Sequence, residues 1–290
     1  AWLTMVALPG AHAAETTPAP CSGVGAARVL LSGQGALESL AFDAQGRLWV
    51  SRLFKGELAR LDQPTAAPVT VATGISGPGG ISVLNAHEAY IGTGNSLNGL
   101  FPGLGLGGIA HVNLDTGVVT PRFKGLGMAN GMVRASDGTF YASDDLSKRL
   151  DRVLPDGTVQ AGWLKLNSNG MALSKDQKTL FVNQMLPAKV LAVDRASGQV
   201  RVVAEAPASR KWTWLDGLDI DAAGRLYVVA YWGGEVWRLE DGRFCRLVDG
   251  LSTPAAVAVG RDANGFAATS IYVVTHSGEL VEVPQAVPKP

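Results

Sequence analysis

The sequence predicts an all-β fold, a six-bladed β-propeller, and three observations support this prediction. A unit of short hydrophobic runs separated by glycine-containing turns recurs six times along the 290 residues. Glycine is abundant, at 36 residues, whereas only 17% of the residues are charged, which favours many short strands joined by tight turns. The sequence shows no convincing helical periodicity of the length that a parallel α/β fold needs between its strands.

The N-terminal residues are expected to lie outside the folded domain. Residues 1–8 are apolar, and the AHA triplet at 11–13 has the small-x-small pattern that precedes signal-peptidase cleavage. Residues 1–13 are therefore interpreted as the remnant of a signal peptide, and residues 14–26 as a leader segment. The predicted location is secreted or periplasmic. The alternative is a frayed apolar tail on a cytosolic protein.

The repeats predict where the blades begin and how the ring closes. Their first residues are Glu38, Gly79, Asn130, Asn169, Asp216 and Ala255. A period of about 40 to 50 residues with several short strands is typical of propeller blades. The sixth repeat contains only three strand-like runs, and one unassigned run, residues 27–31, precedes the first repeat. We expect this N-terminal strand to complete the last blade, which gives a single propeller over residues 27–284 and a tail over 285–290.

The two cysteines, Cys21 and Cys245, fit an oxidising compartment and a single disulfide. Cys21 lies just before the closing strand and Cys245 lies in the expected outer strand of the fifth blade, so they could be neighbours at the closure. Two unpaired thiols are the alternative.

Charge and ring closure limit the expected partners. The chain has 25 basic and 25 acidic residues without a basic patch, so neither nucleic acid nor a membrane is expected as a partner. A closed ring has no open strand edge, and a monomer is therefore expected.

The first residue of each repeat is expected to face the central channel at one mouth of the ring. Four of these six residues carry side-chain oxygens, and the other two are small: the four are Glu38, Asn130, Asn169 and Asp216. Two carboxylates and two amide carbonyls suit Ca²⁺, with other divalent cations possible, whereas zinc would favour His or Cys. The alternative is that these residues satisfy strand ends and hold channel water.

Three segments carry a resemblance to known families. The motifs are ALESLAFDAQGRLWVS at 36–51, SNGMALSKDQKTLFV at 168–182 and LDGLDIDAAGRLYV at 215–228. They resemble the regucalcin/gluconolactonase group and the paraoxonases, which are calcium-bearing six-bladed propellers, and the resemblance covers the whole folded length. The paraoxonases tie their N-terminal segment to a late strand by a disulfide, which favours pairing of Cys21 with Cys245.

The resemblance also implies a metal site and a reaction. It maps Glu38, Asn169 and Asp216 onto metal ligands, and Asn130 onto a residue that binds the metal or lies beside it. It implies hydrolysis of a lactone or ester, in which the cation polarises the carbonyl and a carboxylate takes a proton from water. Asp216 is the expected base. Asp145, just past the second strand of the third repeat, is a second acid candidate, and its alternative role is that of an exposed turn residue.

The chain departs from both families around the expected mouth. Met128 stands where the sugar-lactone enzymes carry an arginine, which argues against gluconolactone, and none of the four histidines is assigned the role of the paraoxonase histidine pair. A Gly- and Leu-rich insertion at 94–108 and several tryptophans favour a hydrophobic substrate. The expected substrate-binding residues are Asn95, Asn98, Phe101, Met128, Trp212, Trp214 and Trp232.

Two other functions remain open from the sequence. A non-enzymatic binding propeller would use the calcium only to stiffen the channel. A strictosidine synthase-like condensation would need a glutamate in the last blade, where residues 253–257 are TPAAV.

Overall fold

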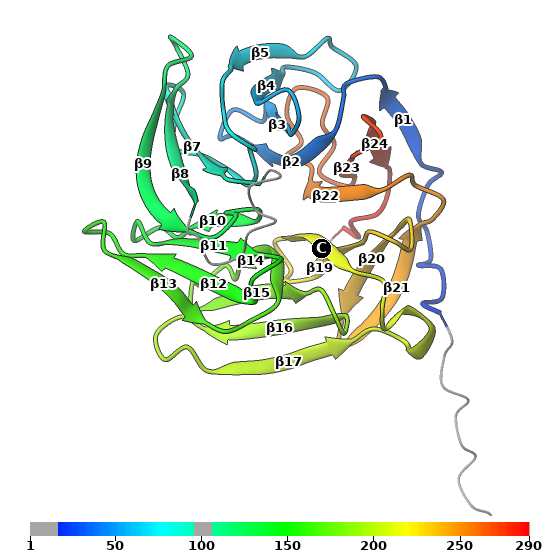
Figure 1. Ribbon diagram of the computed structural model, residues 1–290. Helices are drawn as coiled ribbons and strands as arrows, with labels where there is room; N and C mark the ends of the chain where they lie inside the picture. Colours follow the sequence, from blue (N-terminus) through cyan, green and yellow to red (C-terminus); the bar gives the residue numbers. More distant parts are fainter. Residues whose placement is uncertain (1–16, 96–105, 290) are drawn as a thin grey trace, which may run out of the picture.

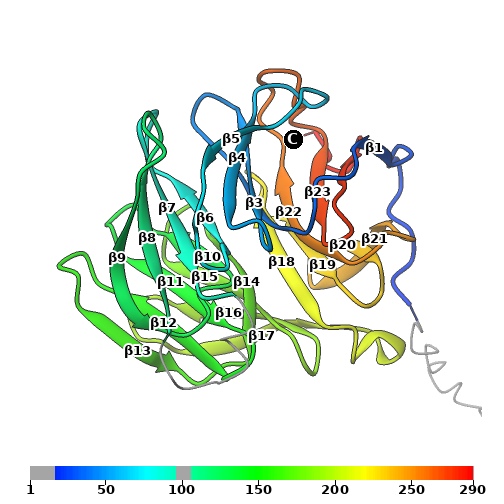
Figure 2. The same ribbon diagram turned by 45° about the horizontal axis from the view of Figure 1, so that its top comes forward.

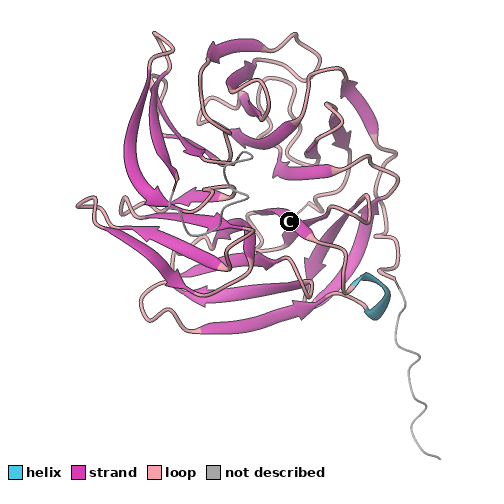
Figure 3. Ribbon diagram, in the orientation of Figure 1, coloured by secondary structure: helices cyan, strands magenta, loops and turns pink. Residues whose placement is uncertain are grey.

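The computed structural model describes residues 17–95 and 106–289. Its strands form six four-stranded antiparallel sheets that are arranged as blades in a ring (Figure 1). Among the described residues the only helical segment is one short 3₁₀ turn, η2 (Ala208–Arg210), and strands and loops make up the rest (Figure 3). The predicted six-bladed β-propeller is confirmed.

Each of the first three blades runs from an inner to an outer strand in chain order. The first blade contains β2 (Leu37–Phe42), β3 (Leu48–Arg52), β4 (Glu57–Leu61) and β5 (Val69–Ala72). The second contains β6 (Ile81–Val83), β7 (Glu88–Thr93), β8 (Gly107–Asn113) and β9 (Val119–Leu126). The third contains β10 (Met132–Arg134), β11 (Phe140–Asp144), β12 (Arg149–Val153) and β13 (Val159–Leu164).

The fourth and fifth blades follow the same order, and the sixth takes its outer strand from the N-terminus. The fourth contains β14 (Ser168–Leu173), β15 (Thr179–Gln184), β16 (Lys189–Asp194) and β17 (Val200–Glu205). The fifth contains β18 (Leu215–Ile220), β19 (Leu226–Ala230), β20 (Glu235–Glu240) and β21 (Arg243–Val248). The sixth contains β22 (Pro254–Val259), β23 (Ile271–Thr275), β24 (Leu280–Val283) and β1 (Arg28–Leu31).

The ring closes where the two ends of the propeller meet. Strand β1, drawn in blue, pairs antiparallel with β24, drawn in red, with Arg28 opposite Glu282 and Val29 opposite Val281 (Figure 2). The Arg28 guanidinium lies 2.7 Å from the Glu282 carboxylate and adds a charged contact to this short pairing. The predicted closure by an N-terminal strand is confirmed.

The segment before β1 is attached to the fifth blade. Cys21 and Cys245 form the predicted disulfide. Around it, Cys21 N donates to Arg246 O over 2.8 Å, and Arg246 N donates to Ala19 O over 2.7 Å. The N-terminal segment therefore joins blade five to blade six by one covalent bond and by backbone hydrogen bonds on both blades.

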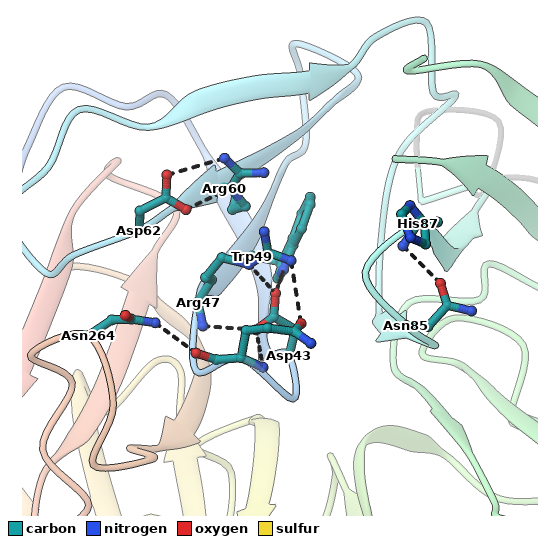
Figure 4. Close-up of polar contacts among 9 residues, drawn as sticks. Asp43, Arg47, Trp49, Arg60, Asp62, Asn85, His87 and Asn264 are labelled. Atoms are coloured by element: carbon teal, nitrogen blue, oxygen red, sulfur yellow. Dashed lines mark hydrogen bonds and ion pairs between the residues drawn. The ribbon is translucent and has the colours of Figure 1, made fainter. Parts of the chain in front are cut away.

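A recurring turn explains the D-x-x-G-R pattern in the sequence. In the first blade, Asp43 Oδ1 accepts the backbone N–H groups of Gln45 and Arg47, while Oδ2 accepts the Arg47 guanidinium and the Trp49 indole N–H (Figure 4). In the fifth blade, Asp221 bonds Ala223, Arg225 and Tyr227 in the same way.

These aspartates fix the hairpin between the first and second strands of their blades. Each one satisfies the turn backbone and also anchors a large buried side chain, Trp49 or Tyr227, of the second strand. Because the hairpin sets the register of both strands, the turn determines which residues reach the mouth of the channel.

The hydrophobic core lies between neighbouring blades. Trp49 of the first blade packs against Ile81 and Ile91 of the second, and similar clusters fill the other interfaces. Each blade therefore depends on both neighbours for burial, which makes ring closure important for stability. No helix in the described parts of the chain has the length and apolar character needed to cross a bilayer.

Removing the disulfide is expected to destabilise the propeller, because the bond joins residues 224 positions apart and restricts the unfolded chain. The double variant Cys21→Ala/Cys245→Ala should lose about 3–5 kcal/mol of unfolding free energy in urea titrations. Wild-type protein that is reduced and alkylated serves as the control and should behave like the variant. Equal unfolding midpoints for the oxidised protein and the variant would contradict this expectation.

Candidate metal centre and binding cavity

One mouth of the ring opens into a cavity of about 230 Å³. The residues that line it come from all six blades and lie in or next to the inner and the second strands. They are Glu38, Leu53, Asn95, Asn130, Asp145, Asn169, Trp214, Asp216, Tyr231, Trp232 and His276. The four predicted metal ligands are all buried, and Asp145, which is half-buried, belongs to the same lining.

The predicted ligands lie at the entrances of the inner strands. Glu38, Asn169 and Asp216 are the second residues of β2, β14 and β18, and Asn130 lies two residues before β10. Because these positions are equivalent in the repeat, the ring places their side chains around the same end of the axis.

Glycines after three of these residues allow the inner strands to approach one another. A Cβ at Gly131 would overlap Asn169 O, a Cβ at Gly170 would overlap Asp216 O, and a Cβ at Gly217 would overlap the backbone of Ala255 and Ala256. The NG and DG pairs of the sequence therefore have a steric cause: the residue after each polar side chain faces the backbone of the next blade.

A second set of cavity residues follows the second strands of the blades. Leu53, Asp145, Tyr231 and His276 are the first residues after β3, β11, β19 and β23. They surround the inner set at the same mouth. The site is thus built from two equivalent positions per repeat. The first position carries oxygen-bearing side chains in four repeats and is recognisable in the sequence, whereas the residues at the second position differ in chemistry.

Hydrogen bonds connect the two sets. His276 Nε2 lies 2.7 Å from Glu38 Oε2, and Tyr231 Oη lies 2.9 Å from His276 Nδ1. Asn130 Nδ2 donates to Asp145 Oδ2 over 3.4 Å. Glu38 and Asp145 therefore each have one carboxylate oxygen hydrogen-bonded to a neighbouring side chain.

The electrostatics of the cavity are dominated by carboxylates. Burial, followed by the negative charges of Glu38 and Asp144, raises the pKa of Asp145 to about 7. Burial and the charges of Glu38 and Asp145 raise the pKa of Asp216 well above its ordinary value. The described lining contains neither Lys nor Arg to offset these charges.

The donors present fit a hard divalent cation. Asp145 Oδ1 is buried and has no hydrogen-bond partner among the described residues, and Asn169 uses its amide nitrogen on Met185 Sδ at 3.7 Å. Two carboxylates and two amide side chains meet the oxygen preference of Ca²⁺. Within the described ranges, no group of three or more His, Cys, Asp or Glu side chains is placed to hold a metal ion, so a cation at this mouth would also need amide oxygens.

Two tryptophans form the apolar wall of the cavity. The rings of Trp214 and Trp232 lie 5.0 Å apart between centroids, at an angle of 59°. Trp214 adopts a left-handed backbone conformation with φ of 54°, which is strained for a bulky residue and is held by a bond from Tyr231 N to Trp214 O.

The other predicted substrate-binding residues lie elsewhere or outside the description. Asn95 lines the cavity, but Met128 is buried away from the lining, and Trp212 is 63% exposed beside Lys211 and also outside it. Asn98 and Phe101 lie outside the described residues.

Sequence reasoning assigned no role to His276, Tyr231 or Leu53, although all three line the cavity. The signal was present, since each follows the second strand of its repeat, as Asp145 does. His87 and His111, by contrast, contact Asp115 and Glu88 and do not line the cavity.

Comparison with known proteins supports the predicted resemblance. The family model described as SMP-30/Gluconolactonase/LRE-like region matches residues 152–275. No curated protein matches the chain.

Several solved structures share the fold. A gluconolactonase from Xanthomonas campestris is 19% identical with a TM-score of 0.70, and the match covers 92% of this chain and 96% of that one. The calcium-binding protein regucalcin from Agrobacterium tumefaciens is 16% identical with a TM-score of 0.71, covering 92% and 95%. A PQQ-bound aldose sugar dehydrogenase from Streptomyces coelicolor is 18% identical with a TM-score of 0.67, covering 92% and 99%. Since these proteins differ in activity, the similarity establishes the fold, and function has to be argued from the cavity.

The raised carboxyl pKa values predict how stability depends on pH in protein freed of metal by a chelator. Folded Asp145 titrates near pH 7 and the unfolded group near its ordinary value of 3.8, so the folded state binds more protons between these values. The free energy of unfolding should therefore fall as the pH rises from about 4 to 7, as measured by urea titration at several pH values. Asp145→Asn should reduce this slope, and Gln199→Ala, at an exposed site without a titratable group, should leave it unchanged. A slope that Asp145→Asn does not alter would refute the assignment.

Proposed function

We propose that the protein is a calcium-dependent hydrolase of lactones or esters. The observation that carries the proposal is the meeting of Glu38, Asn130, Asn169 and Asp216 with Asp145 in one cavity whose described lining has no basic side chain other than His276. The family match at 152–275 supports a lactonase-type activity.

Glu38, Asn130, Asn169 and Asp216 would hold the cation. Bound there, calcium would polarise the carbonyl of the substrate and stabilise negative charge on its oxygen. It would also offset the repulsion between the buried carboxylates that raises their pKa values.

Asp216 is proposed as the base that accepts a proton from the attacking water. As the water oxygen bonds to the carbonyl carbon, the bond to the leaving oxygen breaks and this oxygen requires a proton. Asp145 is proposed to supply it, because burial raises its pKa to about 7 and its Oδ1 atom has no partner among the described residues.

His276 and Tyr231 are proposed to orient Glu38. The chain of contacts from Tyr231 Oη through His276 to Glu38 Oε2 fixes one carboxylate oxygen and leaves the other for the cation.

Leu53, Trp214 and Trp232 favour a substrate with an apolar portion, because they are the large apolar side chains in the described lining of the cavity. The Cys21–Cys245 disulfide supports a secreted or periplasmic location, since such bonds persist in oxidising compartments.

The proposal predicts that a panel of lactones and aryl esters contains members hydrolysed by the purified protein. Activity should disappear with a chelator and return with calcium. Asp216→Asn should reduce kcat by at least about a hundredfold while the protein stays folded, because both a ligand charge and the base are lost. Asp62→Asn, at an exposed site, is the matched control. If no panel member is hydrolysed and calcium only raises the melting temperature, the protein is a binding propeller with a structural metal.

Removing the histidine that hydrogen-bonds to Glu38 should weaken calcium binding. We expect His276→Ala to lower the calcium affinity about 10- to 100-fold in isothermal titration calorimetry, and Tyr231→Phe to lower it less, because the histidine contact to Glu38 remains. His87→Ala is a control, since His87 is exposed and bonded to Asp115. Unchanged affinity in His276→Ala would show that this network does not support the metal.

A further inference from the structure

We propose that the cavity selects substrates that carry an alkylammonium group, so that the preferred substrate is an ester or lactone of an amino or quaternary ammonium compound. The inference rests on the proposed hydrolysis and adds the charge of the substrate. It rests on three independent features of the cavity. These are the charge of its lining, the two tryptophan rings that have no Lys or Arg over them in the described structure, and the Asn95 amide nitrogen that has no acceptor among the described residues.

The lining does not become positive when a metal is counted. Glu38, Asp145 and Asp216 carry a formal charge of −3 when all three are ionised, so a divalent cation would leave −1, or zero while Asp145 holds the proton that it is proposed to donate. The described lining holds no Lys or Arg, and residues 96–105 contain no charged residue in the sequence. An anionic substrate would therefore find no Lys or Arg to pair with, whereas a cationic one would meet carboxylate oxygens.

The basic residues close in sequence to the lining do not change this balance. Arg52, next to Leu53, is paired with Glu57, and Lys55, Lys148 and Lys211 are exposed; none of these four residues lines the cavity. Charges in water at the surface are strongly screened compared with groups inside a cavity.

The tryptophan pair offers a surface that suits an organic cation. Trp214 and Trp232 form the apolar wall, and Tyr231 lies beside them. In the described structure no Lys or Arg is placed over either of these two rings, whereas Lys211 covers Trp212. Aromatic rings that share a cavity with carboxylates bind a methylated ammonium better than a neutral group of the same shape, because the rings attract positive charge.

The same cavity contains a polar anchor. The Asn95 side chain is 9% exposed and lines the cavity, and its Nδ2 atom has no acceptor among the described residues. Such a buried donor requires an acceptor oxygen, which the acyl portion of an ester provides. The cavity therefore offers a donor for an ester oxygen and aromatic rings for a cationic, apolar head.

The test compares two esters of the same shape on the calcium-loaded, full-length protein. Acetylcholine carries the cation, and 3,3-dimethylbutyl acetate is its neutral carbon isostere; 4-acetoxybutanoate supplies an anion. In each reaction water replaces the alcohol at the acyl carbon and the alcohol oxygen takes a proton. We expect kcat/KM for acetylcholine to exceed that for the neutral ester by about tenfold, with the anionic ester hydrolysed least.

Two tryptophan variants provide the matched control. Trp232→Leu should abolish most of the preference for the cation, and Trp212→Leu, equally exposed but outside the lining, should keep it. Calorimetric titration with tetramethylammonium provides a readout that needs no turnover, and binding should weaken only in Trp232→Leu.

The outcomes separate this inference from the proposed hydrolysis. Calcium-dependent hydrolysis of the neutral ester at a rate equal to or above that of acetylcholine would overturn the inference and leave the hydrolase intact. Tetramethylammonium binding without hydrolysis of any ester would support the cation site and reject the hydrolase. Absence of tetramethylammonium binding, or binding that Trp232→Leu leaves unchanged, would overturn the inference.

Discussion

The close approach of the inner strands around the axis is the constraint on which the site depends. It is possible because glycines follow Asn130, Asn169 and Asp216, and a Cβ on any of them would overlap the backbone of the next blade. Because the strands are this close, the side chains of Asn130, Asn169 and Asp216 lie around the same end of the channel. The same condition explains why the site tolerates no larger residue there, although the glycines contact no substrate in the proposal.

The close approach of the inner strands also brings carboxylates together, and their repulsion destabilises the folded protein when no metal is bound. Three carboxylates face one cavity, and burial with mutual repulsion raises the pKa of Asp145 and of Asp216. Natural proteins accept such local instability at functional sites when the surrounding fold is stable enough to hold the groups in place. Here the rigid ring, with cores between all neighbouring blades, holds them, and Trp214 keeps its strained backbone next to Asp216 in the same way.

Much of the fold was predictable from the sequence, because a repeat reveals itself by equivalent residues at regular intervals. Blade number, the closing strand and the position of Cys245 in an outer strand were all predicted correctly. The inner ring of polar residues was also found from its repeat position. Of the residues after the second strands, only Asp145 was predicted as a site residue. Leu53, Tyr231 and His276 were not, since these four residues differ in chemistry and share only their place in the repeat. The positions of Met128 and Trp212 depend on packing and on loop paths that no local pattern encodes.

Closure by the N-terminal strand has a consequence for the order of events during synthesis. Strand β1 leaves the ribosome first, yet its partner β24 is made almost last, and 254 residues separate the Arg28 side chain from its contact on Glu282. Blades one to five can form from contiguous segments, whereas blade six must wait until the chain is nearly complete. A chain that stops before β24 would therefore leave β1 and the last strand of the unfinished blade without their partner, and every blade has its four strands only once β24 has been made.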